Sequence, residues 1–237
     1  MNRTETKEYR FDETKHLHEL LVDNKWKALT GCTTILSILA KPALISWSAN
    51  MAVEYICEHI SELISGTREE QDKILAEAKS AHRKKKEKAG DWGTERHAEI
   101  ENYIKSGIKK DTIKPFIEWA ENNKVKFLES EKHIYSKTHF LGGIVDIVCE
   151  IDGEKWIVDI KTGSGIYPEH FAQMAGYEIM LNEMGYPKIK GHIVLNLKKD
   201  CSFQEKRSIS NEDAKNFFLA CVQVYRLQEK FKNQIIK

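Results

Sequence analysis

Two aspartates and a lysine on neighbouring apolar segments are the first feature of this sequence that could do chemistry. Asp146 lies in the first segment, Asp159 and Lys161 lie in the second, and Asp152-Gly153 separates the two. An Asp-Gly pair between runs rich in Val and Ile predicts a two-residue β-hairpin turn. The register set by this turn predicts that Asp146 and Asp159 face each other on one side of a sheet.

Facing residues on paired strands have Cβ atoms about 4.5–5.5 Å apart. Two carboxylates at that distance repel each other unless one is protonated or a cation lies between them, and Mg²⁺ or Mn²⁺ suits such oxygen ligands. Lys161 falls on the same face as Asp159, where it could position or activate a water or stabilise developing negative charge. The carbonyl of Ile160 could add a metal ligand. The alternative is a surface salt bridge between the two aspartates and Lys161.

The composition indicates a globular chain with a real core. Of 237 residues, 41% are hydrophobic, and 37 basic residues nearly balance 36 acidic ones, for a net charge of +1. This balance excludes a polycation held on nucleic acid by bulk charge, but an acidic metal site would offset lysines that contact DNA elsewhere. Five scattered cysteines without a Cys-x-x-Cys motif argue against a zinc site or an iron–sulfur cluster and favour reduced thiols in a cytoplasmic protein. We expect no membrane span and no signal peptide.

The hydrophobic periodicity changes near residue 124, from helical in front to strand-like behind. Before that point, we expect an irregular start over 1–28 with one short helix around His16 to Val22. Helical segments should follow at 33–63, broken at Pro42, at 67–88, at 92–105 after a break at Gly90-Asp91, and after Pro115. Behind, strands around 125–135, 144–151, 156–160 and 189–197 alternate with helices at 168–184 and 211–232. The pattern predicts an α/β fold, with a mixed sheet flanked by helices and a mainly helical N-terminal portion. We expect one domain, with that portion over 1–90 and the core over 91–237.

Four short motifs follow one another between about residues 91 and 180. They are Gly93-Thr-x-x-His97-x-x-x-Glu101, Gly143-x-x-Asp146, Asp159-x-Lys161-Thr-Gly163 and Gln173-x-x-x-Tyr177. In this order they resemble the RecB-like branch of the PD-(D/E)XK nuclease superfamily. The segments Thr33–Leu36 and Lys41–Trp47 are further similar to the start of phage-encoded proteins of this branch, and the mitochondrial genome-maintenance exonuclease is similar in overall plan.

The resemblance implies a restriction-endonuclease-like sheet and a Mg²⁺- or Mn²⁺-dependent deoxyribonuclease with one or two ions. It favours an exonuclease at free, single-stranded DNA ends, in recombination, repair or phage DNA processing, in the cytosol of a bacterium or a phage-infected host. It implies that His97, Asp146, Asp159 and Glu131 hold metal, although Glu131 is equally compatible with a solvated strand charge. Gln173 and Tyr177 would orient the lysine or touch DNA; ordinary helix–sheet packing is the alternative. The role of Glu101 is less defined.

Two basic stretches could follow a phosphate backbone. The denser contains Arg83, Lys84, Lys85 and Lys86, and the second contains Lys105, Lys109, Lys110 and Lys114. A solvated helix face explains either stretch equally well. Trp47 and Trp92 could stack on bases, but core packing is the simpler role.

Two other functions remain open from the sequence. The chain could be a non-catalytic DNA-binding or assembly module that retains the nuclease fold, although every expected acidic and lysine position is filled. It could also be an unrelated metal hydrolase that acts on small phosphoesters. No protein partner is indicated.

Overall fold

The computed structural model describes residues 3–210, 212–232 and 234–235. They form two compact units, one of Met1–Ile38 with Arg96–Lys237 and one of Leu39–Glu95. That the two constitute a single domain stays a prediction. The candidate site residues Glu131, Asp146, Asp159 and Lys161 lie in the first unit, and the denser basic stretch lies in the second.

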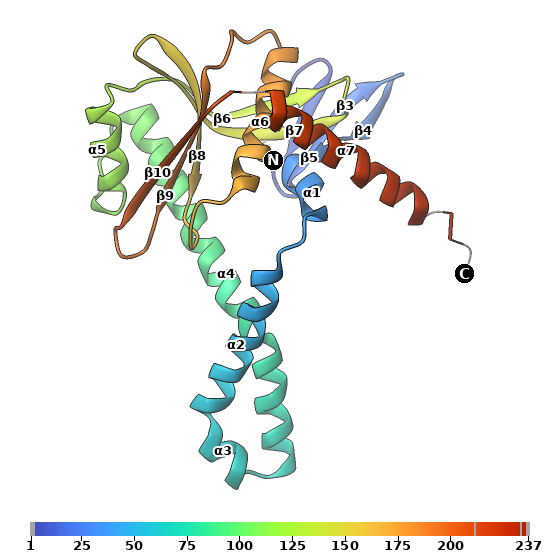
Figure 1. The fold of residues 1–237 in the computed structure, drawn as a ribbon, viewed down its shortest axis with the longest axis vertical. Coiled ribbons are helices and arrows are strands. Elements are labelled where there is room, and N and C mark those ends of the chain that lie inside the picture. Colours follow the sequence, from blue (N-terminus) through green and yellow to red (C-terminus); the bar gives the residue numbers. More distant parts are fainter. Residues whose placement is uncertain (1–2, 211, 233, 236–237) are drawn as a thin grey trace. The chain divides into compact units, whose positions relative to one another are not determined.

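The larger unit is built on a mixed six-stranded sheet (Figure 1). The strands are β5 (Thr30–Gly31), β6 (Lys126–Ser136), β7 (Leu141–Ile151), β8 (Glu154–Lys161), β9 (Gly191–Leu197) and β10 (Phe203–Ile209). Their order is β10-β9-β8-β7-β5, and β6 also pairs with β7. The pairs β8–β9 and β5–β7 are parallel and the others are antiparallel. The predicted α/β class with a mixed sheet is therefore confirmed, although β5 and β10 were not predicted.

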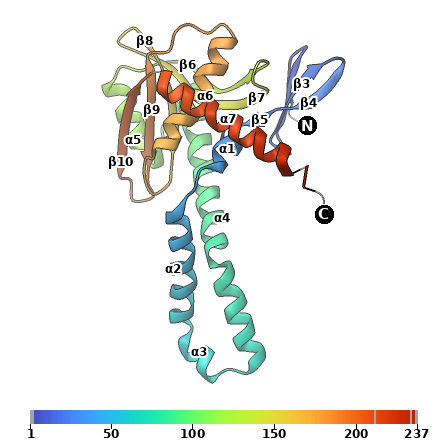
Figure 2. The same cartoon turned by 45° about the vertical axis from the view of Figure 1, so that its right-hand side comes forward.

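Helices cover both faces of this sheet (Figures 1 and 2). On one face, α5 (Lys114–Asn122) and Ile100 of α4 (Arg68–Ser106) pack into a buried apolar cluster with alternate residues of β7, β8 and β9. On the other face, α6 (Pro168–Glu183) packs on the strands and α7 (Glu212–Lys232) packs on α6. A Cβ at Gly176 would come within 2.6 Å of the Phe218 ring, so the glycine lets α7 approach α6 closely.

From Arg3 onward the chain forms strands, so the predicted irregular start with a helix around His16 to Val22 is wrong. A four-stranded antiparallel sheet runs in the order of its strands, β1 (Arg3–Glu5), β2 (Tyr9–Asp12), β3 (Leu17–Val22) and β4 (Lys25–Ala28). The overlooked signal is Asp23-Asn24. Both residues have positive φ, 52° and 58°, and close the β3–β4 hairpin as a tight turn.

The helical segments begin with α1 (Cys32–Ile35) and the 3₁₀ turn η1 (Leu36–Ile38), and continue with α2 (Pro42–Glu58) and α3 (Ile60–Ser65). The helix α4 then runs unbroken for 39 residues, and a second 3₁₀ turn, η2 (Asp111–Ile113), precedes α5. The predicted break at Gly90-Asp91 is wrong, because an interior glycine costs a helix only about 1 kcal/mol and long helix-forming side chains surround it.

Among the described residues, no single helix is long and apolar enough to cross a membrane. The segments 32–38 and 42–58 reach the required length and hydropathy only when they are taken together.

Candidate metal-dependent active site

The candidate site lies where β7 and β8 separate. The two strands pair from Ile151↔Glu154 to Ile147↔Val158, in the register that the Asp-Gly turn predicts. In that register the next pair would join Asp146 and Asp159, but the described ladder stops before it. Instead, a carboxylate oxygen of Asp146, Oδ2, accepts a hydrogen bond of 2.7 Å from the backbone N–H of Ile160. The side chain of Asp146 thus takes the place of a backbone hydrogen bond between β7 and β8, and its carboxylate lies in the opening between the two strands.

Glu131 reaches the same opening from the other neighbour of β7. Ser130 pairs with Ile147 and Lys132 pairs with Val145, so the residue between them, Glu131, lies opposite Asp146. Glu131 has a φ of 48°, which is unusual for a residue other than glycine inside a strand. Backbone of this kind is concentrated at functional sites. The sheet therefore sets acidic residues of β6, β7 and β8 in one row.

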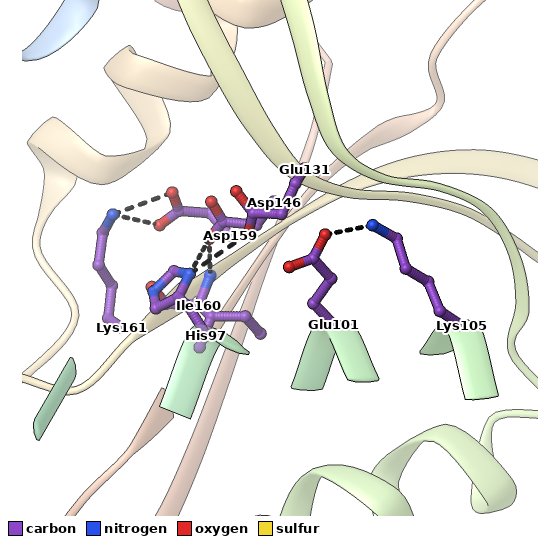
Figure 3. Close-up of polar contacts among 8 residues, drawn as sticks. All are labelled: His97, Glu101, Lys105, Glu131, Asp146, Asp159, Ile160 and Lys161. Carbon is purple, nitrogen blue, oxygen red and sulfur yellow. Dashed lines mark hydrogen bonds and ion pairs between the residues drawn. The ribbon is translucent and has the colours of Figure 1, made fainter. Parts of the chain in front are cut away.

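His97 of α4 completes the group, and its imidazole lies beside the carboxylates (Figure 3). Its Nε2 lies 3.1 Å from the carbonyl oxygen of Ile160, to which it donates when protonated. With Nε2 engaged in this way, Nδ1 is the nitrogen that faces the carboxylates, 3.7 Å from Asp146 Oδ2 and 3.8 Å from Glu131 Oε1. Burial alone would lower the pKa of His97, but the nearby carboxylates outweigh it and raise the pKa to about 9.

Asp159 and Lys161 form an ion pair beside this group. The ammonium Nζ of Lys161 lies 2.7 Å from Oδ2 and 2.9 Å from Oδ1 of Asp159, whose side chain is only 3% exposed. Burial raises the pKa of Asp159, as it does that of Asp146. Burial opposes the charge on Lys161, but the two aspartates outweigh it and raise the pKa of its ammonium.

The donor set suits a hard divalent cation. One ligand atom each from His97, Glu131 and Asp146 lies within 4.8 Å of the others. Carboxylate oxygens are the ligands that Mg²⁺ and Mn²⁺ prefer in proteins. Nδ1 of His97 lies 3.7 Å from an oxygen of Asp146 and 3.8 Å from an oxygen of Glu131, so the three side chains already meet in one place. All three donors would reach one ion after small side-chain movements and loss of the Nδ1 proton of His97, which the raised pKa retains at neutral pH until metal binding displaces it.

Two predicted metal ligands have other partners here. Asp159 is paired with Lys161, and the carbonyl of Ile160 faces the imidazole of His97. Their assignment as metal ligands stays a prediction. The salt bridge that the sequence left open as an alternative exists between Lys161 and Asp159, but Asp159 is buried and Lys161 is half-buried, unlike a pair on a solvated surface.

Gln173 and Tyr177 are buried on α6, on the side that faces the separating strands. The amide of Gln173 donates a hydrogen bond of 2.5 Å to the Tyr177 hydroxyl. Burial, together with the nearby carboxylates of Asp159 and Asp146, raises the pKa of Tyr177 well above 10. A Cβ at Gly143 would come within 2.8 Å of the tyrosine ring, so the glycine of the Gly-x-x-Asp motif makes room for it. Their contact with lysine or DNA stays a prediction.

The second basic stretch is engaged with glutamates. Lys105 pairs with Glu101 on the preceding turn of α4, beside the candidate site (Figure 3). The remaining three ion pairs are Lys109–Glu121, Lys110–Glu99 and Lys114–Glu118. These contacts favour a solvated, ion-paired surface over a dedicated phosphate track. In the smaller unit, Lys84 pairs with Glu77, and the role of Arg83, Lys84, Lys85 and Lys86 in binding DNA stays a prediction.

One cluster that holds α6 in place was not predicted from the sequence. The carboxylate of Glu178 contacts His192 Nε2 at 3.0 Å, Ser210 Oγ at 2.7 Å and Lys215 Nζ at 3.0 Å. These partners come from β9, the segment after β10 and α7, so the cluster ties three parts of the fold to the helix that carries Gln173 and Tyr177. The three partners lie 14, 32 and 37 residues after Glu178, which explains why no local motif indicates the cluster.

No protein-family model matches the chain. No curated protein matches it either. Among solved structures, the alkaline exonuclease LHK-Exo from Laribacter hongkongensis aligns over 87% of this chain and 92% of its own, at 12% identity and a TM-score of 0.44. The same exonuclease in complex with dAMP aligns over 86% and 89%, at 12% identity and a TM-score of 0.43. The protein SSO0001 aligns over 84% and 74%, at 14% identity and a TM-score of 0.41. These are similarities of fold alone.

Proposed function

We propose that this chain is a divalent-metal-dependent DNA nuclease of the RecB-like branch of the PD-(D/E)XK superfamily. The observation that carries the proposal is the meeting of His97, Glu131 and Asp146 at the point where β7 leaves the Asp159–Lys161 pair. These residues come from four elements, which are α4, β6, β7 and β8. A structural role alone would not require an imidazole, three carboxylates and an ammonium at one break in a sheet.

His97, Glu131 and Asp146 would hold Mg²⁺ or Mn²⁺, and Asp159 would contribute once its contact with Lys161 loosens. A bound divalent cation would polarise a phosphoryl oxygen and make a nearby water more acidic. The number of ions, one or two, is left to experiment. The hydrogen bond from Ile160 N–H holds the Asp146 carboxylate in place, so little side-chain freedom remains to be lost on binding.

Lys161 would act on the phosphodiester directly. Its raised pKa keeps the ammonium charged at neutral pH. A charged ammonium can donate a hydrogen bond that orients the attacking water, and it can stabilise the negative charge that develops on the phosphoryl oxygens. It cannot accept a proton in that state, so the general base must be another group. Gln173 and Tyr177 would support this lysine and the adjacent strand of DNA from α6.

The test is degradation of end-labelled DNA by the purified protein with Mg²⁺ or Mn²⁺. We expect hydrolysis that stops when EDTA is added. We also expect Asp159→Ala and Lys161→Ala to abolish it, and Lys155→Ala, a lysine of the same strand, to leave it unchanged. Activity that survives both Asp159→Ala and Lys161→Ala would refute the assigned site.

An exonuclease acting at single-stranded ends is the mode that we propose. Linear single-stranded DNA should be degraded from its ends, while a covalently closed circle of the same sequence should stay intact. Cleavage of the closed circle at a comparable rate would instead identify an endonuclease, with the same site residues.

A further inference from the structure

Helix α7 carries a stripe of apolar side chains that the fold does not cover. Phe217, Val224, Leu227 and Phe231 are 48%, 46%, 52% and 61% exposed, and Ala220 between them is exposed as well. The face that α7 turns to the protein contains other residues, among them Phe218, Cys221 and Val222. The helix therefore has one apolar face used by the fold and a second that remains in solvent. Large apolar patches on a surface mark interaction sites.

The spacing of the stripe is that of a helix–helix seam. Phe217, Ala220, Val224, Leu227 and Phe231 are separated by three, four, three and four residues. This is the alternation of the a and d positions in a heptad repeat, which brings all five side chains to one narrow line along a helix. Such a line fits the matching line of another helix. It is narrower than the broad apolar face by which a helix usually packs on a sheet.

We propose that a second copy of this chain covers the stripe, and that the two α7 helices pair antiparallel in a homodimer. The inference does not depend on the proposed nuclease function. When Ala220 faces the partner's Val224, Phe217 faces the partner's Leu227, and each pairing occurs twice around the two-fold axis. The small Ala220 makes room for the β-branched Val224, and the seam contains apolar residues in each of these four layers.

The charges at the two ends of α7 select this partner and this orientation. Glu212 and Asp213 are in the first turn, and Lys230 and Lys232 are in the last. In the same register Glu212 lies opposite the partner's Lys232, so that both acidic ends meet basic ends. A parallel pair would bring acidic end to acidic end and basic end to basic end. The helix dipoles also favour the antiparallel arrangement.

Sedimentation equilibrium of the full chain over a range of concentrations tests the dimer. We expect reversible dimerisation, and we expect Leu227→Glu to raise the dissociation constant roughly thirtyfold or more, because it buries a charge in the seam. Phe231→Glu serves as a second variant at a more exposed position. The control is Ile108→Glu, which puts a charge on an apolar residue of similar exposure, 54%, outside α7 and should leave the dimer intact.

A charge exchange tests the orientation. Lys232→Glu should weaken the dimer roughly twofold to fivefold, and Glu212→Lys in the same chain should restore it. A wild-type chain that stays monomeric at the highest concentration would overturn the proposal. So would a dimer that persists in both Leu227→Glu and Phe231→Glu, or a helix that associates only with a different protein. Failure of the charge exchange, with the dimer otherwise sensitive to Leu227→Glu, would overturn the antiparallel arrangement.

Discussion

The buried carboxylate of Glu178 should make the fold sensitive to acid in a way that one substitution removes. Its hydrogen bonds and ion pair with His192, Ser210 and Lys215 outweigh the cost of burial and lower its pKa from 4.5 to about 2. A carboxyl group whose pKa is lower in the folded chain stabilises the fold at any pH above its pKa in the unfolded chain. That contribution is lost as the pH falls from 4.5 toward 2.

The size of the effect follows from the shift of about 2.5 pKa units, from 4.5 to about 2. At 1.36 kcal/mol per unit, the ionised Glu178 contributes about 3 kcal/mol at pH 7. The side chain is 3% exposed, so solvent screening removes little of this. Because the folded and unfolded states titrate over different ranges, about 1.4 kcal/mol of the contribution is lost between pH 7 and pH 3.5.

Urea unfolding followed by tryptophan fluorescence measures this loss. We expect the free energy of unfolding of the wild type to fall between pH 7 and pH 3.5 by about 1.4 kcal/mol more than that of Glu178→Gln. An exposed control, Glu154→Gln, should keep the wild-type dependence. If Glu178→Gln loses as much stability as the wild type over this range, the ionised cluster does not anchor α6 in the way described.

Three further results are expected. Burial lowers the pKa of His18 from 6.5 to about 4, so protonation favours the unfolded chain. The free energy of unfolding should therefore fall by about 2 kcal/mol from pH 7 to pH 5, and His18→Gln should remove this pH dependence in urea unfolding. Gly142→Ala should lower the melting temperature by several degrees, because the new Cβ would lie 2.6 Å from His18 Cβ. Gly163→Ala, whose Cβ would have nothing within 4 Å, should leave the melting temperature unchanged, and equal melting temperatures of the two variants would contradict the close contact. Glu131→Gln should raise the Mg²⁺ concentration for half-maximal DNA cleavage about tenfold or more, and an unchanged requirement would remove Glu131 from the metal group.

The hairpin at the centre of the site is predictable because its information is local. Asp152-Gly153 sets the turn, and period-two alternation beyond it leaves one register that buries the apolar side chains. The structure has that register as far as Ile147 and Val158. The separation of the strands at Asp146 is not predictable in the same way, since it depends on the carboxylate bonding to Ile160 N–H and on His97, 63 residues from its carbonyl partner.

The errors at the N-terminal side also have physical causes. The alternation in Leu17–Val22 is short enough to fit either a helix turn or a strand, and only pairing with β2 and β4 decides for the strand. The Gly90-Asp91 pair looks like a stop signal, but its cost of about 1 kcal/mol is small against the propensity of a 39-residue helix. The position of Glu131 depends on the pairing of β6 with β7, in which Ser130 faces Ile147 and Lys132 faces Val145.

Binding of Mn²⁺, counted by electron paramagnetic resonance in the samples used for DNA cleavage, tests the central claim most directly. We predict that the wild type binds the ion and degrades DNA, and that Asp146→Ala loses both. A matched control on the same strand, Glu150→Ala, should keep both. Binding and cleavage that persist in Asp146→Ala would contradict the account of this site.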